Sequence, residues 1–229
     1  LEDGFTGNLI RSQERGWYTQ TDEELGKAIA GYYGNISQMD ACVGKVLDAL
    51  DELGLSENTI IVYTTDHGEM AGAHRTWTKQ NMYEQSVGVP LIVRLPDDSN
   101  ANTSQDHLIE QIDLYPTLAE LCKLPKPENI QGRSFASLLR NEAYEPREYA
   151  YSEYHFVHRD FTRDDRYVGK PPMLMVRTDQ WKLNYLSWER SELYDLWNDP
   201  KEFTNVIDEP ANADITKELT DIAKRMYAS

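Results

Sequence analysis

The spacing of apolar residues predicts a long amphipathic helix near the start of the chain. From Leu25 onward, apolar side chains recur every three or four positions until Gly54, which ends the run. Thr21 or Asp22 is placed to cap the N-terminus, and acidic residues fill the first turn, as the helix dipole favours. Because the apolar positions form one stripe, we expect that stripe to pack into a core, with Cys42 as a buried thiol on it.

Two short apolar runs after this helix have the length and composition of strands. Residues 58–63 are a β-branched run that ends just before a turn at Gly68, which indicates a buried strand of a parallel sheet. Residues 89–94 form a second apolar strand. Two shorter helical segments are then expected, in residues 109–124 and 135–140.

From residue 149 the pattern changes to short strands, which predict a small antiparallel sheet with a closing helix. The strands are expected at 149–154, 173–178, 180–186 and 192–196, and the helix at 213–227. We therefore assign an α/β fold: part of a large mixed sheet flanked by helices, followed by a small antiparallel sheet with a C-terminal helix. The expected boundaries are an incoming loop at 1–20, the C-terminal portion of an α/β domain at 21–145, and a small α+β subdomain at 146–229.

The segment 64–79 carries the main candidate chemistry. Asp66 and His67 follow the predicted strand directly, at the carboxyl end where open α/β sheets bind ligands. An adjacent carboxylate and imidazole suit a divalent cation, and the ammonium of Lys79 suits an oxyanion held by the same metal. Asp-His-Gly is also typical of an ordinary turn, in which Gly68 would supply a positive φ. The tripeptide alone is therefore weak evidence for a functional site, and only the neighbouring strands and charged residues strengthen it.

Composition narrows the set of partners. The chain has 229 residues and a net charge of -16, which argues against nucleic acid and anionic membranes, since both need clustered Lys and Arg. An anionic substrate then needs a local cationic pocket. No apolar run approaches the ~20 residues of a membrane-spanning helix. Cys42 and Cys122 lie far apart and form no Cys-x-x-Cys pair, so neither zinc nor a disulfide framework is indicated.

Several motifs along the chain point together to a known family. They are Asp66-His67-Gly68, His74-x-x-Trp77-x-Lys79, Val89-Pro90-Leu91-Ile92, and Glu192-Leu193-Tyr194-Asp195-Leu196 with Asp199-Pro200 and Asn205. With these motifs the chain resembles the C-terminal half of the sulfatases in the alkaline phosphatase superfamily. The resemblance implies an alkaline-phosphatase-like fold, with 21–145 as part of the catalytic domain. It also implies metal-dependent hydrolysis of a sulfuric ester, in a sulfated small molecule or a sulfated glycan.

The resemblance further implies roles for individual residues. Asp66 and His67 match a pair that completes a metal site, with calcium as the first expectation and magnesium or manganese as alternatives. Lys79 matches the lysine that contacts the sulfate. For His74 the sequence does not distinguish a structural role from a substrate contact, because the partners of its two ring nitrogens are not evident from sequence. The candidate substrate contacts near the site are His74, Arg75 and Trp77.

A second group of candidate substrate contacts lies in the loop 155–170. His155 and His158 stand there among arginines and phenylalanines without regular spacing, a composition suited to gripping an anionic substrate. An ordinary solvated loop, in which aspartates neutralise the arginines, fits the same residues.

The nucleophile of the family is missing from this sequence. Sulfatases make a formylglycine within Cys/Ser-x-Pro/Ala-x-Arg, and neither Cys42 nor Cys122 stands in that pattern. The family's early pair of metal-binding aspartates is absent too. We expect both in an N-terminal half upstream of Leu1, which would be a partner of this chain. One Asp and one His bind calcium poorly, since the ion prefers about six to eight oxygen ligands, so the chain alone is expected to be inactive.

Two other functions fit the same motifs. A phosphonate monoester or phosphodiester hydrolase of the same superfamily presents a similar Asp-His pair and lysine. His67 stands where many relatives carry Asn, and its nitrogen also suits manganese, iron or zinc. A non-catalytic fragment that binds glycans through the loop 155–170 is the alternative from another class. The sequence leaves the compartment open between periplasmic or extracellular and cytoplasmic.

Overall fold

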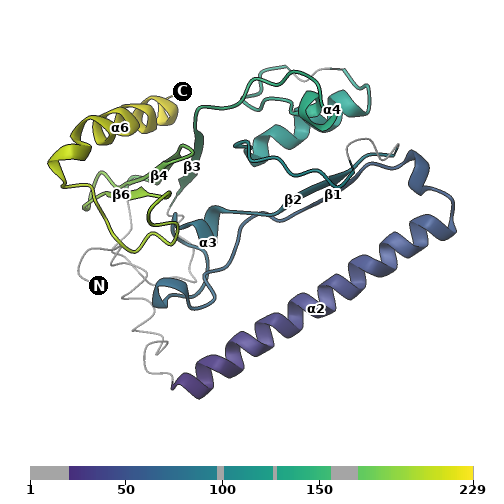
Figure 1. Cartoon of the computed structure of the whole chain (residues 1–229), viewed down its shortest axis with the longest axis horizontal. Helices are drawn as coiled ribbons and strands as arrows, with labels where there is room; N and C mark the ends of the chain where they lie inside the picture. Colours follow the sequence, from purple (N-terminus) through teal and green to yellow (C-terminus); the bar gives the residue numbers. More distant parts are fainter. Residues whose placement is uncertain (1–20, 97–100, 126–127, 156–169, 229) are drawn as a thin grey trace.

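The computed structural model describes residues 21–96, 101–125, 128–155 and 170–228, in which a long helix extends from a body with a two-stranded and a four-stranded sheet (Figure 1). The α-helices are α2 (Asp22–Glu52), α3 (Glu84–Val87), α4 (Leu114–Leu121), α5 (Ala136–Leu139) and α6 (Ala213–Tyr227). The strands are β1 (Ile61–Thr64), β2 (Leu91–Arg94), β3 (Ala150–Tyr154), β4 (Met173–Arg177), β5 (Trp181–Tyr185) and β6 (Glu192–Asp195). Short 3-10 turns are η2 (Ser56–Asn58), η3 (Ala73–Arg75), η4 (Gln111–Asp113) and η6 (Pro210–Asn212).

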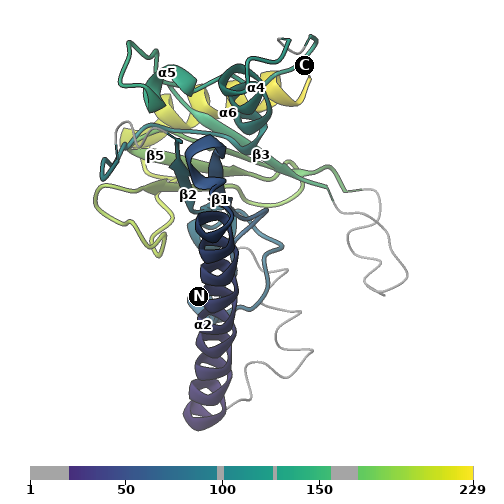
Figure 2. The ribbon, with the colours of Figure 1, turned by 90° about the vertical axis from the view of Figure 1, so that its right-hand side faces the viewer.

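Helix α2 forms where the sequence predicts it but does not pack as expected. Thr21 and Glu24 form a capping box at its N-terminus, and Gly54 follows its end with a φ of 66°. None of its residues is buried by the described part of the chain, and Figures 1 and 2 show it projecting away from both sheets. The prediction that its apolar stripe packs into a core is therefore wrong within the described residues. The expected burial of Cys42 is wrong as well, because its side chain is exposed in the described structure.

Strands β1 and β2 pair with each other in an antiparallel sheet, with Ile61 opposite Arg94. The prediction of a buried parallel strand at residues 58–63 is therefore wrong in the described structure. Side chains of β1 are only half-buried, and Ile92 on β2 is 62% exposed. The pairing is antiparallel because the chain between the strands turns back as a loop and the short α3, without a long helix that crosses over the sheet.

The predicted small antiparallel sheet and closing helix are confirmed, and with them the α/β class. Strands β3, β4, β5 and β6 are neighbours in that order, and every pair is antiparallel. Helix α6 lies along one face of this sheet (Figure 1). The core between them includes Val176, Leu183, Leu193, Leu219 and Ala223, all fully buried. Among the described helices, none is both long and apolar enough to cross a membrane.

The opposite face of the four-stranded sheet packs on the segment that carries the candidate chemistry. Because side chains alternate along a strand, Met173 and Met175 point away from α6 and contact Met82. Tyr194 on β6 joins Met70 in a neighbouring cluster. The sheet is therefore sandwiched between α6 and the segment 70–87, and that segment rests on a well-packed base.

Candidate functional site

Asp66 and His67 form a compact pair in the turn that leaves β1. The Asp66 Oδ2 atom lies 3.3 Å from His67 Nε2, and Asp66 Oδ1 accepts the His67 backbone N–H at 3.1 Å. The His67 Nδ1 atom lies 2.8 Å from the Gly68 carbonyl oxygen. Because a carbonyl oxygen only accepts, Nδ1 carries the proton in this contact, and Nε2 is the ring nitrogen that faces the Asp66 carboxylate.

The two side chains remain accessible. The Asp66 side chain is 82% exposed and that of His67 is 37% exposed. The pKa of the Asp66 carboxyl lies below its ordinary value: slight desolvation raises it, but the His67 ring and hydrogen bonds from Thr65 and the backbone lower it by more. The carboxyl is therefore ionised at neutral pH, as a metal ligand must be.

This donor set fits the edge of a metal site. In the ranges that the structure describes, no three His, Cys, Asp or Glu side chains come together as a metal-binding group. A carboxylate and an imidazole nitrogen side by side could supply two ligands to one ion. The remaining ligands of a calcium-type site then have to come from another chain segment, because that ion takes about six to eight.

One residue of α3 holds both the Asp66-His67 turn and the backbone of Lys79. The Gly68 N–H donates to the Ser86 carbonyl at 2.8 Å. The Ser86 hydroxyl in turn donates to the Lys79 carbonyl at 2.5 Å. Ser86 is itself buried. The two segments that sequence analysis selected are therefore fixed to the same turn of helix.

Gly68 is needed for close approach and not for a left-handed backbone. A Cβ at this position would collide with the backbone carbonyl of Gln85. Among the described glycines, only Gly54 and Gly72 have a positive φ, so the expected positive φ at Gly68 is not observed. The glycine lets the turn sit directly against the backbone of α3.

Glu69 closes the loop between this turn and Lys79. Its carboxylate accepts the Thr78 backbone N–H and, at 3.4 Å, that of Ala71. The Met70 N–H also donates to the Thr78 carbonyl at 3.0 Å. These bonds turn the chain back on itself, so that Lys79 returns toward the turn although the two are well separated in sequence.

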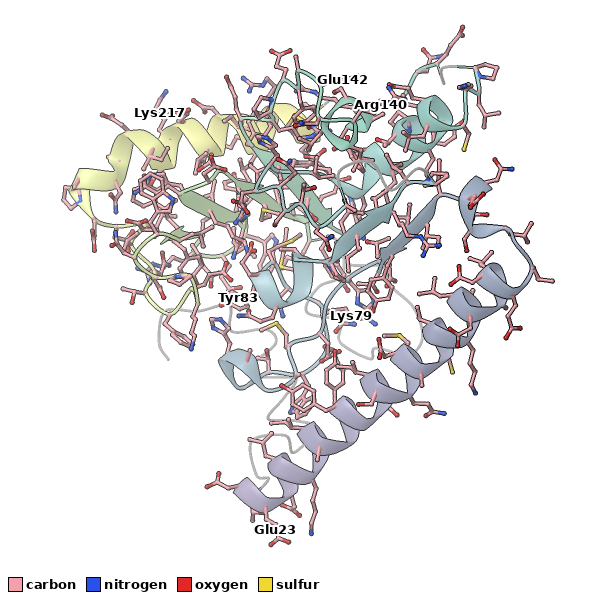
Figure 3. The ribbon with its side chains drawn as sticks, turned by 45° about the vertical axis from the view of Figure 1, so that its right-hand side comes forward. Glu23, Lys79, Tyr83, Arg140, Glu142 and Lys217 are labelled. Carbon is pink, nitrogen blue, oxygen red and sulfur yellow. The ribbon has the colours of Figure 1, made fainter. Side chains whose placement is uncertain are left out.

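Lys79 is free to meet a ligand. Its side chain is exposed, and no hydrogen bond or ion pair engages its ammonium among the described residues. Figure 3 shows Lys79 between the β1–β2 pair and α2. Trp77 nearby in sequence is half-buried, and the side chain of Arg75 lies outside the described part of the structure.

His74 lies in an aromatic stack. Its ring centroid is 4.0 Å from that of Tyr83, at an interplanar angle of 6°, and 5.1 Å from that of Phe203. Burial lowers the pKa of the imidazole, while a hydrogen bond with the Lys201 backbone and the charge of Asp199 offset part of that effect. Its Nε2 atom is buried and has no hydrogen-bond partner in the described structure. A substrate contact by His74 stays a prediction.

Gln111 is a support of the turn that sequence reasoning missed. Its Nε2 donates to the backbone carbonyls of Thr65 and Asp66, the latter at 3.1 Å. Gln111 belongs to η4, which an ion pair between buried Asp113 and Arg147 fastens to the chain that precedes β3. No spacing in the sequence signals this role, because it depends on a contact between segments 45 residues apart.

The second group of predicted substrate contacts is only partly described. His155 follows β3, is exposed, and lies 3.2 Å from the Glu153 carboxylate. Its ring centroid is 6.3 Å from that of Tyr227 at the end of α6. These contacts are with β3 and α6 and not with the segment 64–79. His158 lies outside the described residues.

Comparisons with known proteins identify relatives of this chain. Residues 72–228 match the family model described as N-sulphoglucosamine sulphohydrolase, C-terminal, and residues 7–124 match the model described as sulfatase. Arylsulfatase K of Mus musculus is 33% identical over 194 residues, which cover 82% of this chain and 34% of that protein. The chain thus spans about a third of the length of the curated relatives it matches.

Two solved structures extend the likeness to the fold. The phosphonate monoester hydrolase of Agrobacterium radiobacter has a TM-score of 0.82 at 27% identity, over 91% of this chain and 42% of its own. A protein solved in complex with its substrate, D-glucosamine-2-N,6-O-disulfate, has a TM-score of 0.73 at 28% identity, over 83% of this chain and 38% of its own.

Proposed function

The chain belongs to the sulfatase family, and we propose that it forms the C-terminal part of an enzyme that hydrolyses a sulfate ester. One observation carries this proposal. Ser86 accepts from the turn that bears Asp66 and His67 and donates to the backbone of Lys79, so a pair of metal donors and a cation share one support. A site of this kind suits a substrate whose negative charge is held between a metal and a lysine.

The proposed roles follow from the chemistry of the three side chains. Asp66 and His67 hold a divalent metal through the ionised carboxylate and the Nε2 lone pair. The Gly68 carbonyl orients the imidazole by accepting from its Nδ1 atom. Calcium is the metal that the family resemblance implies, and when bound it supplies a Lewis acid and a template for the sulfate. Lys79 binds a sulfate oxygen with its ammonium and stabilises charge there.

The rest of the active site belongs to the part of the fold that this chain lacks. Sulfatases generally rely on a divalent metal and a formylglycine, and no formylglycine motif occurs in these residues. In the described structure, large apolar side chains on α2 and β2 are also exposed to solvent, including Tyr33 (63% exposed), Val46 (62%) and Ile92 (62%). We assign this surface to contact with the preceding part of the same fold, because the chain matches only about a third of the length of its curated relatives.

A sulfated glycan or sulfated small molecule is the substrate class we propose. The neighbour solved with a disulfated glucosamine supports a sugar, and the anionic group fits the cationic Lys79. His74, Arg75, Trp77, His155 and His158 remain the candidate contacts to the rest of the substrate. The net charge of -16 makes a local cation at the site more important for binding an anion.

Hydrolysis of a phosphonate monoester is the second candidate function. A specific observation favours it: the phosphonate monoester hydrolase of Agrobacterium radiobacter matches 91% of this chain with a TM-score of 0.82. The imidazole of His67 also suits manganese or zinc, which accept nitrogen ligands more readily than calcium does.

Parallel assays separate the two functions. A longer protein that contains this chain and its upstream region is supplied in turn with 4-nitrophenyl sulfate and 4-nitrophenyl phenylphosphonate, with calcium and then with manganese. We expect the larger kcat/KM for the sulfate ester and its loss when Asp66→Ala is introduced. A larger kcat/KM for the phosphonate would establish the second function instead. Hydrolysis of neither ester by correctly folded, metal-loaded protein would overturn both.

A further inference from the structure

Four charged side chains meet beneath the N-terminus of α3. The Lys182 ammonium, on β5, is completely buried and lies 2.7 Å from Glu202 Oε1 and 3.0 Å from Glu84 Oε1. Glu202, in the loop after β6, is also fully buried at its side chain. Arg177 on β4 reaches Glu84 Oε1 at 3.3 Å. Two acids and two bases therefore form a neutral group between the sheet and α3.

Glu202 also bonds to the backbone of α3 itself. Its Oε2 atom accepts the N–H of Glu84, the first residue of the helix, at 2.7 Å. A carboxylate at that end of a helix satisfies a backbone donor that has no partner inside the helix. Lys182 then links the same Glu202 to the Glu84 side chain. Helix α3 is thus fixed to the C-terminal sheet by both a backbone bond and a side-chain ion pair.

We propose that the buried Lys182–Glu202 pair positions the active site, by setting α3 and through it the Asp66-His67 turn and Lys79. The path is short. The pair holds Glu84, and two residues later Ser86 accepts from Gly68 and donates to the Lys79 carbonyl. Lys182 and Glu202 are positioning residues in this arrangement, because they act on the site through α3.

The chemistry favours positioning over simple stabilisation. Removing two charges from water is costly, and well-packed neutral side chains at such places often give equal or greater stability. The short ion pair, together with the directional hydrogen bonds from the Glu84 N–H to Glu202 and from Lys182 to the Glu84 carboxylate, does, however, specify one placement of the helix, whereas apolar packing tolerates small shifts. The contact with Gly68 leaves no room for such shifts, since a Cβ there would already meet the backbone of Gln85.

This inference deepens the proposed function, because the segments that α3 holds are those we assign to metal and sulfate. Its geometric part can be tested without any catalytic assay. The backbone amides of Gly68 and Met70 donate to Ser86 and Thr78, so their hydrogen exchange reports on the turn and on the loop. Amide exchange on the 229-residue chain, followed by mass spectrometry or NMR, therefore measures the positioning directly.

The test variant is Lys182→Met combined with Glu202→Gln, which removes both charges and leaves no unpaired ion. We expect exchange in residues 66–79 to accelerate about tenfold or more, the size of effect that follows loss of a charged hydrogen-bond partner. Exchange in β4, β5 and α6 should change by less than about twofold, because the core around Leu183 is untouched. Glu202→Asp keeps the charge beside Lys182 but shortens the side chain that reaches the Glu84 N–H, and it carries the same test, with a smaller effect, if the double variant fails to fold.

Asn205→Ala is the matched control. Asn205 accepts the Leu193 and Ile207 backbone N–H groups at 3.0 and 3.1 Å, in the same loop region, and forms no hydrogen bond with α3 in the described part of the chain. It should accelerate exchange around residues 190–207 and spare 66–79. Unchanged exchange at 66–79 in the double variant, or equal acceleration of every segment, would overturn the proposal. A longer protein without sulfatase activity would count against the proposed function and leave this exchange result standing.

Discussion

The Gly68 amide donates to the Ser86 carbonyl at 2.8 Å, across a contact so close that only glycine fits on one side of it. The Ser86 hydroxyl then donates to the backbone of Lys79. A strand end and a loop that are separated in sequence are thereby placed by one buried serine.

Gly68→Ala should destabilise the chain by about 1–3 kcal/mol, because the new methyl group must push the turn away from α3. Gly34→Ala is the matched control. It lies in the interior of α2 with nothing within 4 Å of the added Cβ, so it should stabilise by about 0.5–1 kcal/mol through helix propensity. Urea denaturation of the two variants measures both effects, and a shift of the same sign for both would contradict the account.

His74→Phe should flatten the dependence of stability on pH. Burial lowers the His74 pKa from its ordinary 6.5, so the unfolded chain binds a proton that the folded chain resists. Wild-type stability should therefore fall as the pH drops below about 6.5 toward the lowered pKa. Phenylalanine keeps the stack on Tyr83 and cannot titrate. Denaturant midpoints measured from pH 7.5 to 5 check this, and parallel curves for both proteins would rule it out.

Val46→Glu should behave differently in this chain and in a longer protein that completes the fold. The side chain is 62% exposed here, so the change in unfolding free energy should stay within about 0.5 kcal/mol. In the longer protein we expect a loss of about 2 kcal/mol or more, because the carboxylate would be buried without a partner. Asp48→Ala, on the other side of α2, should have little effect in either protein. A harmless Val46→Glu in the longer protein would remove the assigned contact surface.

The 229-residue chain alone should not hydrolyse 4-nitrophenyl sulfate, with or without added calcium. Asp66 and His67 supply two ligands where calcium prefers about six to eight, and the nucleophile motif of the family is absent. The assay needs a purified, folded chain and a chelator control. Turnover that depends on the metal and disappears in Asp66→Ala would show that the chain holds a complete site.

Local signals in the sequence predicted the elements well. The cap at Thr21, the stop at Gly54 and the apolar face of α6 depend on neighbours along the chain, and the structure confirms those elements. The strand that pairs with β1, and the burial of the apolar stripe of α2, depend on segments that are distant in sequence. A β-branched run has the same composition in a parallel or an antiparallel sheet, which is why residues 58–63 were assigned the wrong partner direction.

The proposed site divides in the same way. The roles proposed for Asp66, His67 and Lys79 depend on their own side chains, so residue type and spacing are enough to nominate them. Ser86 and Gln111 act through bonds to backbone groups of other segments, and no residue pattern announces such bonds. Lys182 lies in a predicted strand and Glu202 in a predicted loop. A charged side chain in such a segment is normally exposed to solvent, yet both of these are buried.

The most direct measurement of the central claim is the rate of sulfate ester hydrolysis by the longer protein with Lys79→Ala. The account predicts a fall in kcat/KM of about 100- to 1,000-fold, as for loss of one group that stabilises charge in a transition state. It also predicts a change in unfolding free energy within about 0.5 kcal/mol, because the Lys79 side chain is exposed. Lys217→Ala, on the exposed side of α6 (Figure 3), should leave kcat/KM unchanged. Wild-type activity in Lys79→Ala would contradict the assignment of this lysine to the sulfate.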